Sequence, residues 1–161
     1  MFEKFGEFDS VSELNMCAEG LKNEGDIDSL IEMAAENGID KEDAQDYADG
    51  IVDKLATPLM AALGKIEVEC RELKPKEIME DWVDYIKVQC MGSEMMAVAV
   101  RRKGKTIKGC IAALLKWSFE HQIPINDDVK KAAGISAGRV TLGIPGMGTA
   151  KKIIKEYYMG K

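Results

Sequence analysis

The sequence predicts an all-α protein, a multi-helix bundle with an acidic N-terminal module and a basic C-terminal module. Three observations predict it: apolar side chains at helical spacing, clear helix-capping residues, and an uneven distribution of charge. The longest apolar stripe lies in residues 105–121. Its apolar side chains, at positions i, i+3, i+4, i+7 and i+8, are Ile107, Cys110, Ile111, Leu114 and Leu115. We expect this stretch to be the buried central helix of the C-terminal half.

The N-terminal module, residues 1–56, is predicted to contain three short helices. Ser10–Glu13 is a capping box, which predicts a helix running to about Lys22. A second helix is expected to end at Asn37–Gly38 through a left-handed turn. Asp40 is the expected N-cap of the third.

The rest of the chain is predicted to contain a central helical hairpin, residues 57–92, and a basic C-terminal helical module, residues 93–161. Thr57–Pro58 has the residue types of a helix start. Residues 66–70 also alternate as a strand would, so helix and strand both stay open there. A closing helix is expected over Thr149–Tyr158.

Charge divides the chain more sharply than its net value of −6 suggests. Residues 1–90 carry 23 acidic and 9 basic side chains, a net charge of −14, whereas residues 91–161 carry 5 acidic and 13 basic side chains, a net charge of +8. Such polarity indicates two surfaces with different partners, or two halves that attract each other. The candidate acidic face for a protein partner is Asp40, Asp43, Asp46 and Asp49.

Several functional classes are disfavoured by the sequence. There is no run of about 18 apolar residues and no basic-then-apolar start, so we expect a cytoplasmic protein with no membrane partner. The four cysteines are scattered and His121 is the single histidine, which argues against a metal site, a disulfide framework or a cofactor. No catalytic constellation stands out, so we expect a protein that is not an enzyme.

Two motifs in the C-terminal module favour nucleic-acid binding. Ala133–Val140 resembles the turn of a helix-turn-helix, although Lys130 stands where that motif has a small residue. Ile144–Gly148 resembles the hairpin of helix-hairpin-helix modules, although the following alanine comes about two residues early. The alternative for the second motif is a structural turn with Thr149 as N-cap. The candidate nucleic-acid contacts are Arg101, Arg102, Lys103, Lys105, Lys108, Arg139, Gly146, Gly148, Lys151 and Lys152.

A further likeness lies in Lys103–Leu115 and Ala150–Tyr158, which resemble the PcfK-like proteins of Gram-positive conjugative elements and phages. The resemblance covers about a fifth of the chain. It implies an accessory protein of a mobile element that acts by binding, because some proteins resembling that family are anti-CRISPR inhibitors of RNA-guided nucleases. Such nucleases hold nucleic acid in positively charged channels. A surface of carboxylates, such as the 16 acidic residues up to Asp53, is complementary to a channel of that kind.

The sequence therefore predicts a non-catalytic accessory protein of a phage or mobile element, a candidate anti-CRISPR inhibitor that binds a bacterial protein. The alternative is a DNA-binding protein that uses its C-terminal module. The sequence does not decide between the acidic and the basic half, and it leaves the oligomeric state open.

Overall fold

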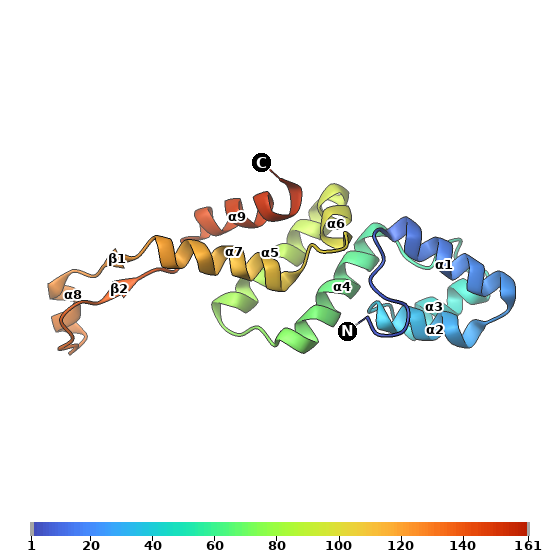
Figure 1. Ribbon diagram of the computed structural model, residues 1–161, viewed down its shortest axis with the longest axis horizontal. Helices are drawn as coiled ribbons and strands as arrows, with labels where there is room; N and C mark the ends of the chain where they lie inside the picture. The colour runs from blue at the N-terminus through green and yellow to red at the C-terminus, as the bar shows by residue number, and fades with distance from the viewer. Residues whose placement is uncertain (1, 161) are drawn as a thin grey trace.

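The computed structural model describes residues 2–160, and 65% of the chain is helical. This confirms the predicted all-α class in its coarse form. Figure 1 shows an elongated molecule with α1–α3 at one end and a projecting arm at the other. The elements are α1 (Val11–Glu24), α2 (Ile27–Glu36), α3 (Lys41–Ala48), α4 (Pro58–Leu73), α5 (Ile78–Gly92), α6 (Glu94–Arg101), α7 (Ile107–Glu120), β1 (Ile123–Pro124), α8 (Asp127–Ala132), β2 (Thr141–Leu142) and α9 (Met147–Met159).

Helices α1–α3 begin and end close to the residues that the sequence predicted. Ser10 Oγ accepts a hydrogen bond from Glu13 N at 3.1 Å, while the Glu13 carboxylate accepts one from Asp9 N. The predicted left-handed turn after α2 is present, with φ of 70° at Gly38. Asp40 is the N-cap of α3, but its side chain makes no capping hydrogen bond. These helices enclose the first hydrophobic core, whose largest fully buried members are Leu14, Leu30, Met33 and Leu55.

Helix α4 crosses from the first core to the second. Thr57 Oγ1 caps it by accepting a hydrogen bond from Met60 N at 3.2 Å, and residues 66–70 are helical, which settles the question of helix or strand. Ala61 belongs to the first core, whereas Ala62 and Ile66 belong to the second. The central helix of the molecule is therefore α4.

The second core joins α4, α5, α6, α7 and α9. Its members include Trp82 and Ile86 from α5 and Ile154 and Tyr158 from α9. Side chains from residues 57–92 and from residues 93–161 thus share one core. The predicted division of the chain into residues 1–56, 57–92 and 93–161 stays a prediction.

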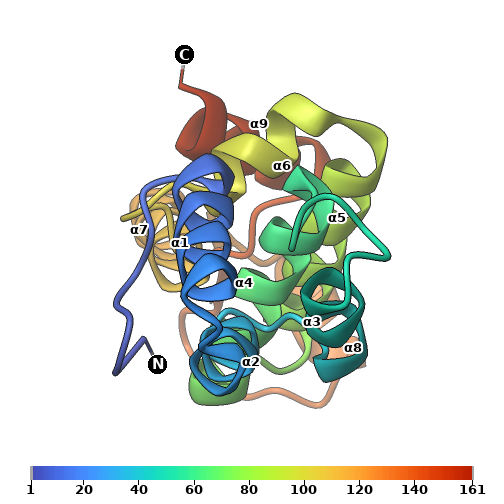
Figure 2. The same ribbon diagram turned by 90° about the vertical axis from the view of Figure 1, so that its right-hand side faces the viewer.

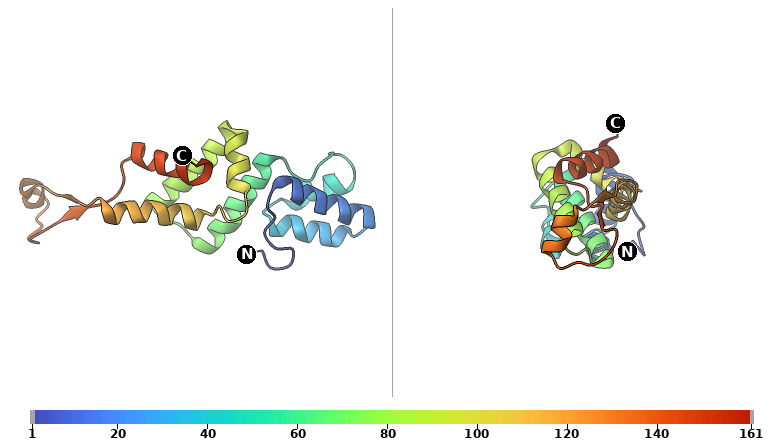
Figure 3. Two further views of the ribbon diagram at one scale, coloured as in Figure 1. Left: turned by 45° about the horizontal axis from the view of Figure 1, so that its top comes forward. Right: turned by 90° about the vertical axis from the view of Figure 1, so that its left-hand side faces the viewer.

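Helix α7 is not the buried central helix that its apolar stripe predicted. Ile107, Cys110 and Leu114 are buried, but Leu115 is 54% exposed and Phe119 is 76% exposed. The stripe is buried only where α7 lies against the body, because the C-terminal end of the helix extends beyond it toward the arm (Figure 3).

The arm consists of β1, α8 and β2. The two strands are antiparallel, with Ile123 opposite Leu142 and Pro124 opposite Thr141, and α8 lies at the tip (Figure 1). Every side chain from His121 to Ile144 is exposed or half-buried. The arm therefore extends from the molecule without adding to either core.

Two glycines allow α2 and α4 to touch through their main chains. A Cβ atom on Gly38 would overlap the backbone of Gly64, and a Cβ atom on Gly64 would overlap the backbone of Asn37. No side chain separates the two segments at this point, so the N-terminal module lies directly against α4.

Candidate binding surfaces

The predicted acidic face lies on α3 and its two cap residues, at the end of the molecule that Figure 2 turns toward the viewer. Asp40, Asp43, Asp46 and Asp49 are all exposed and follow one another at intervals of three residues. Asp49 Oδ1 accepts a hydrogen bond from Gln45 Nε2 at 3.0 Å. Within residues 2–160, none of the four aspartates forms an ion pair. Their charges are therefore available to an external partner.

A groove of about 510 Å³ lies between α1, α3 and the chain leading into α4. Its walls include Met16, which is 64% exposed, and the carboxylates of Glu19 and Asp53. The Asn15 side chain fixes one wall, since it donates a hydrogen bond to Ala56 O at 2.9 Å and accepts one from Ala56 N at 3.0 Å. The N-terminal module thus combines exposed carboxylates with a groove that has both apolar and polar side chains in its walls, Lys54 among them.

Arg101, a predicted nucleic-acid contact, is a structural residue instead. It is 1% exposed, and its guanidinium donates hydrogen bonds to Phe8 O and Asn37 Oδ1, both at 3.1 Å. These partners are 93 and 64 residues away in the chain, so no local sequence signal could have identified them. A buried guanidinium cannot reach a phosphate, and Arg101 is therefore removed from the candidate contacts.

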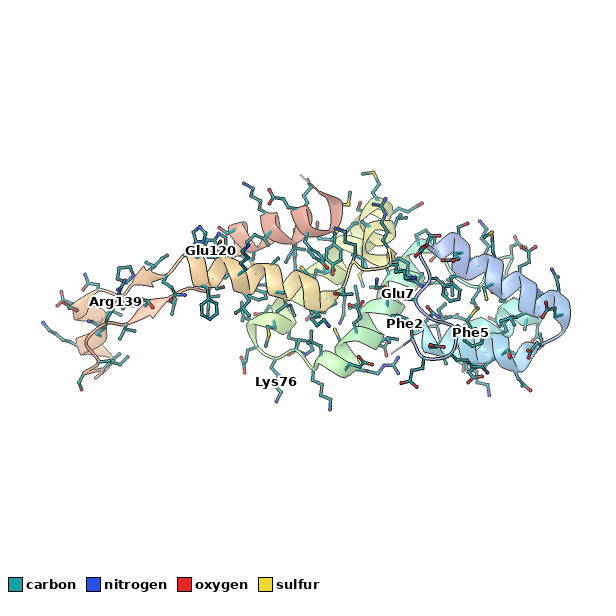
Figure 4. All side chains as sticks on the ribbon, viewed as in Figure 1. Phe2, Phe5, Glu7, Lys76, Glu120 and Arg139 are labelled. Carbon is teal, nitrogen blue, oxygen red and sulfur yellow. The ribbon has the colours of Figure 1, made fainter. Side chains whose placement is uncertain are left out.

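A buried ionic cluster continues from Arg101 to α4. Lys65 Nζ lies 2.6 Å from Glu7 Oε1 and donates a hydrogen bond to Arg102 O at 2.7 Å. Glu69 Oε2 accepts a hydrogen bond from Ile107 N at 2.5 Å, and burial raises the pKa of the Glu69 carboxyl. Glu7 is labelled in Figure 4, on the N-terminal segment where it meets the body of the molecule. The cluster therefore ties this segment to α4, α6 and the start of α7.

The other predicted basic contacts do not gather in one place. Lys105 is half-buried, and its Nζ donates a hydrogen bond to Tyr157 O at 2.6 Å and lies 5.0 Å from the centre of the Tyr157 ring. Lys103 Nζ is 3.7 Å from Asp9 Oδ1. Arg139 lies on the arm, which Figure 4 shows at the opposite end of α7. The exposed basic candidates are Arg102, Lys103, Lys108, Arg139, Lys151 and Lys152.

The helix-turn-helix prediction is wrong. Gly134, with φ of 68°, does make a turn after α8, but the chain continues through non-helical residues 135–140 into β2. Lys130 holds this loop, because its Nζ donates a hydrogen bond to Gly138 O at 2.9 Å and pairs with Asp127 at 2.6 Å. Residues 135–140 therefore provide no recognition helix.

The helix-hairpin-helix prediction is also wrong. A strand, β2, precedes Ile144–Gly148 where the motif requires a helix. Gly146 is the N-cap of α9 and Gly148 lies within the helix, so the alternative with Thr149 as N-cap is wrong by three residues. Both glycines are exposed at the start of α9.

The His121 ring packs on its own helix, and the Cys90 and Cys110 thiols are buried. The His121 ring stacks on Trp117 with centroids 4.3 Å apart, and His121 Nδ1 lies 2.9 Å from Trp117 O. Burial raises the pKa of the Cys90 thiol to about 11 and that of Cys110 to about 12. Since the thiolate is the nucleophile, these two protonated thiols are poorly suited to covalent chemistry at neutral pH.

Over residues 2–160, no three or more His, Cys, Asp or Glu side chains are grouped so that they could hold a metal ion. In the same part of the chain, no helix has the length and apolar character required to span a membrane.

Comparison with protein-family models, curated proteins and solved structures finds no match to this chain. Its function is therefore inferred from the residues of these surfaces.

Proposed function

We propose that this protein acts by binding, without catalysis, and that its N-terminal module docks on a basic protein surface. The observation that carries the proposal is the set of four exposed aspartates on α3 and at its two ends, none of which forms an ion pair within residues 2–160. Residues 2–56 carry 16 acidic and 4 basic side chains, a net charge of −12. A field of this sign attracts a basic partner and accelerates its association.

The groove beside α3 supports a protein partner over a small ion. Protein interfaces combine an apolar centre with a polar or charged rim. Exposed Met16, Ile51 and Val52 supply apolar surface on the N-terminal module, and the aspartates of α3 supply charge. A partner with a basic surface and a protruding apolar side chain would match both features.

An RNA-guided nuclease is the partner class that we propose. Its nucleic-acid channel is positively charged, and a carboxylate surface of matching extent would compete with the nucleic acid for it. The resemblance of Lys103–Leu115 and Ala150–Tyr158 to PcfK-like proteins supports a role in a phage or mobile element. The proposed function is thus that of an anti-CRISPR inhibitor that acts by occupying the channel.

The experiment is titration of the protein into a Cas9-type nuclease, with cleavage of target DNA as the readout. The test variant reverses the charges of the acidic face: Asp40→Lys, Asp43→Lys, Asp46→Lys and Asp49→Lys. The matched control reverses four exposed acids on and just before α5: Glu77→Lys, Glu80→Lys, Asp81→Lys and Asp84→Lys. We expect inhibition by the wild-type protein and the control, and loss of inhibition in the test variant.

Two outcomes would contradict this proposal. No inhibition by the wild-type protein would remove the inhibitor function. Equal inhibition by the wild-type protein and the test variant would remove the acidic face as its mechanism.

The second candidate function is DNA binding by the C-terminal half. Its support is the six exposed basic candidates on α7, α9, the arm and the α6–α7 connection. With about five phosphate contacts, the slope of log K against log salt should be about −4 to −5. Fluorescence anisotropy with duplex DNA tests it, and Arg139→Ala should weaken binding. Absence of binding at about 50 mM salt, where phosphate contacts are strong, would contradict this function.

A further inference from the structure

The groove of about 510 Å³ beside α1 is large enough to hold a side chain of another molecule. One wall is the face of α1 between Val11 and Glu19, a length of about 12 Å at the helical rise. The other wall is the chain at residues 53–58. The two hydrogen bonds between the Asn15 side chain and the main chain of Ala56 join these walls. The groove is therefore formed before any ligand enters it.

Tyr47 brings a hydroxyl without a partner to this groove. The residue is 5% exposed and lines the groove, and within residues 2–160 its hydroxyl makes no hydrogen bond. The contacts of Lys22 involve other parts of Tyr47: its Nζ donates a hydrogen bond to Tyr47 O at 2.6 Å and lies 4.6 Å from the centre of the ring. The hydroxyl of a largely buried tyrosine usually has a hydrogen-bond partner. A ligand in the groove would supply the one that is missing.

The charged side chains of the lining favour a positively charged ligand. Glu19 and Asp53 are exposed in the walls, and neither forms an ion pair within residues 2–160. Burial and, after it, the charge of Glu19 raise the pKa of the Tyr47 hydroxyl, so this carboxylate acts on that hydroxyl. Lys54 is the one basic residue of the lining, which leaves the lining a net charge of −1 within a module of −12.

An arginine side chain has the chemistry that this groove requires. Its guanidinium is always charged and holds five N–H donors in a fixed fork, whereas lysine has one ammonium with three donors. The groove offers three acceptors in the carboxylates of Glu19 and Asp53 and the hydroxyl oxygen of Tyr47. The methylene stem of an arginine packs on apolar surface. Val11 and Met16, which is 64% exposed, provide that surface in the α1 wall.

We propose that the groove between α1 and residues 53–58 binds an arginine side chain of a protein partner. This inference rests on the proposed function, because it names the side chain by which a basic partner enters the N-terminal module. Ile51 and Val52 are outside the lining, so they remain a separate apolar contact. The groove and the acidic face lie at the same end of the molecule, where one partner can reach both (Figure 1).

The experiment is an NMR titration of the full, isotope-labelled chain with a blocked pentapeptide that has one arginine between alanines. Three further peptides replace the arginine with lysine, with glutamate, or with citrulline, its neutral isostere. The side-chain amide of Asn15 reports binding in the groove wall. We expect saturable binding of the arginine peptide, weaker binding of the lysine peptide, about tenfold weaker binding of the citrulline peptide, and none of the glutamate peptide.

Two variants remove one polar group of the groove each. Glu19→Gln and Tyr47→Phe should each weaken binding of the arginine peptide about threefold, and the double variant about tenfold. The matched control is Glu24→Gln, which removes an exposed acid of α1 outside the groove and should leave the affinity unchanged. Circular dichroism checks that each variant is folded, and Glu19→Gln carries the test if Tyr47→Phe is not.

Equal affinity for the arginine and citrulline peptides would overturn the proposal. Equal losses in Glu19→Gln and Glu24→Gln would also overturn it, because only the general field of the module would then matter.

The nuclease titration separates this inference from the proposed function. Full inhibition by the groove double variant, together with loss of inhibition in the α3 variant, would overturn the arginine site and leave the proposed function in place. No inhibition by the wild-type protein, together with selective binding of the arginine peptide, would remove the inhibitor function and support the arginine site.

Discussion

The body and the arm use apolar side chains in opposite ways. In the body, Leu114 and Ile154 are packed from all sides and belong to one continuous core. In the arm, Ile123 and Leu142 face each other across two strands, and both are exposed. The two regions therefore differ in what their apolar residues do: those of the body stabilise the fold, whereas those of the arm remain exposed.

The same contrast appears among charged residues that are adjacent in the sequence. Arg101 is buried and bonded to two distant segments, whereas Arg102 is exposed. In the sequence, both residues are arginines and each counts as one positive charge. Their roles differ because α6 turns one toward the N-terminal segment and ends before the other.

The largest expected effect concerns Arg101. Arg101→Met should lower the free energy of unfolding by about 2–6 kcal/mol, because it leaves two buried acceptors, Asn37 Oδ1 and Phe8 O, without their donor at about 1–3 kcal/mol each. Arg102→Met is the matched control and should change stability by about 0.5 kcal/mol or less. Urea unfolding measures both, and equal losses would show that Arg101 is not the buried member of the pair.

The next effect concerns the buried part of α7. Leu114→Ala should cost about 2–5 kcal/mol, since it opens a cavity in the second core. Lys116→Ala, whose side chain is exposed on the same helix, should cost about 0.5 kcal/mol or less. Similar losses in the same unfolding measurement would mean that α7 presents a different face to the body.

The buried ionic cluster should make stability depend on pH through Glu69. Burial raises the pKa of this carboxyl in the folded state above the ordinary value of 4.5, so the folded state holds the proton more tightly than the unfolded state does. Its contribution to stability is therefore fully present below pH 4.5 and is lost as pH rises through the folded-state pKa. The stability of the wild-type protein relative to Glu69→Gln should fall over that range. Urea unfolding across it measures the difference, and a constant or rising difference would contradict the prediction.

The smallest effect is expected in the arm. Val129→Ala should change the free energy of unfolding by about 0.5 kcal/mol or less in urea unfolding, because Val129 is 58% exposed. A loss as large as that of Leu114→Ala would show that the arm packs on the body of its own chain.

The local structure of the body could be predicted from the sequence because short-range chemistry determines it. Ser10 and Thr57 cap their helices through the backbone amide three residues later. Gly38 makes the turn that its lack of a side chain allows. These contacts need no knowledge of the rest of the chain.

The arm and the role of Arg101 could not be predicted, because both depend on distant contacts. The apolar stripe of α7 predicts one buried face, but only the tertiary packing shows that Leu114 is buried while Leu115 stays 54% exposed. Ala133–Val140 has the glycine and serine of a helix-turn-helix, yet the partner of the following residues is β1, which precedes α8. The four aspartates of the acidic face are exposed, and their role as a binding surface stays a prediction.

The contact between Gly38 and Gly64 has a consequence for how this protein could engage its partners. The main chain of Gly38 contacts the main chain of Gly64 with no side chain between them. Because helix α4 continues from this contact into the second core, the N-terminal module can rotate little relative to the rest of the body. A partner that docks on the acidic face would therefore meet a surface that is already in place, and its association would lose little free energy to ordering of the module.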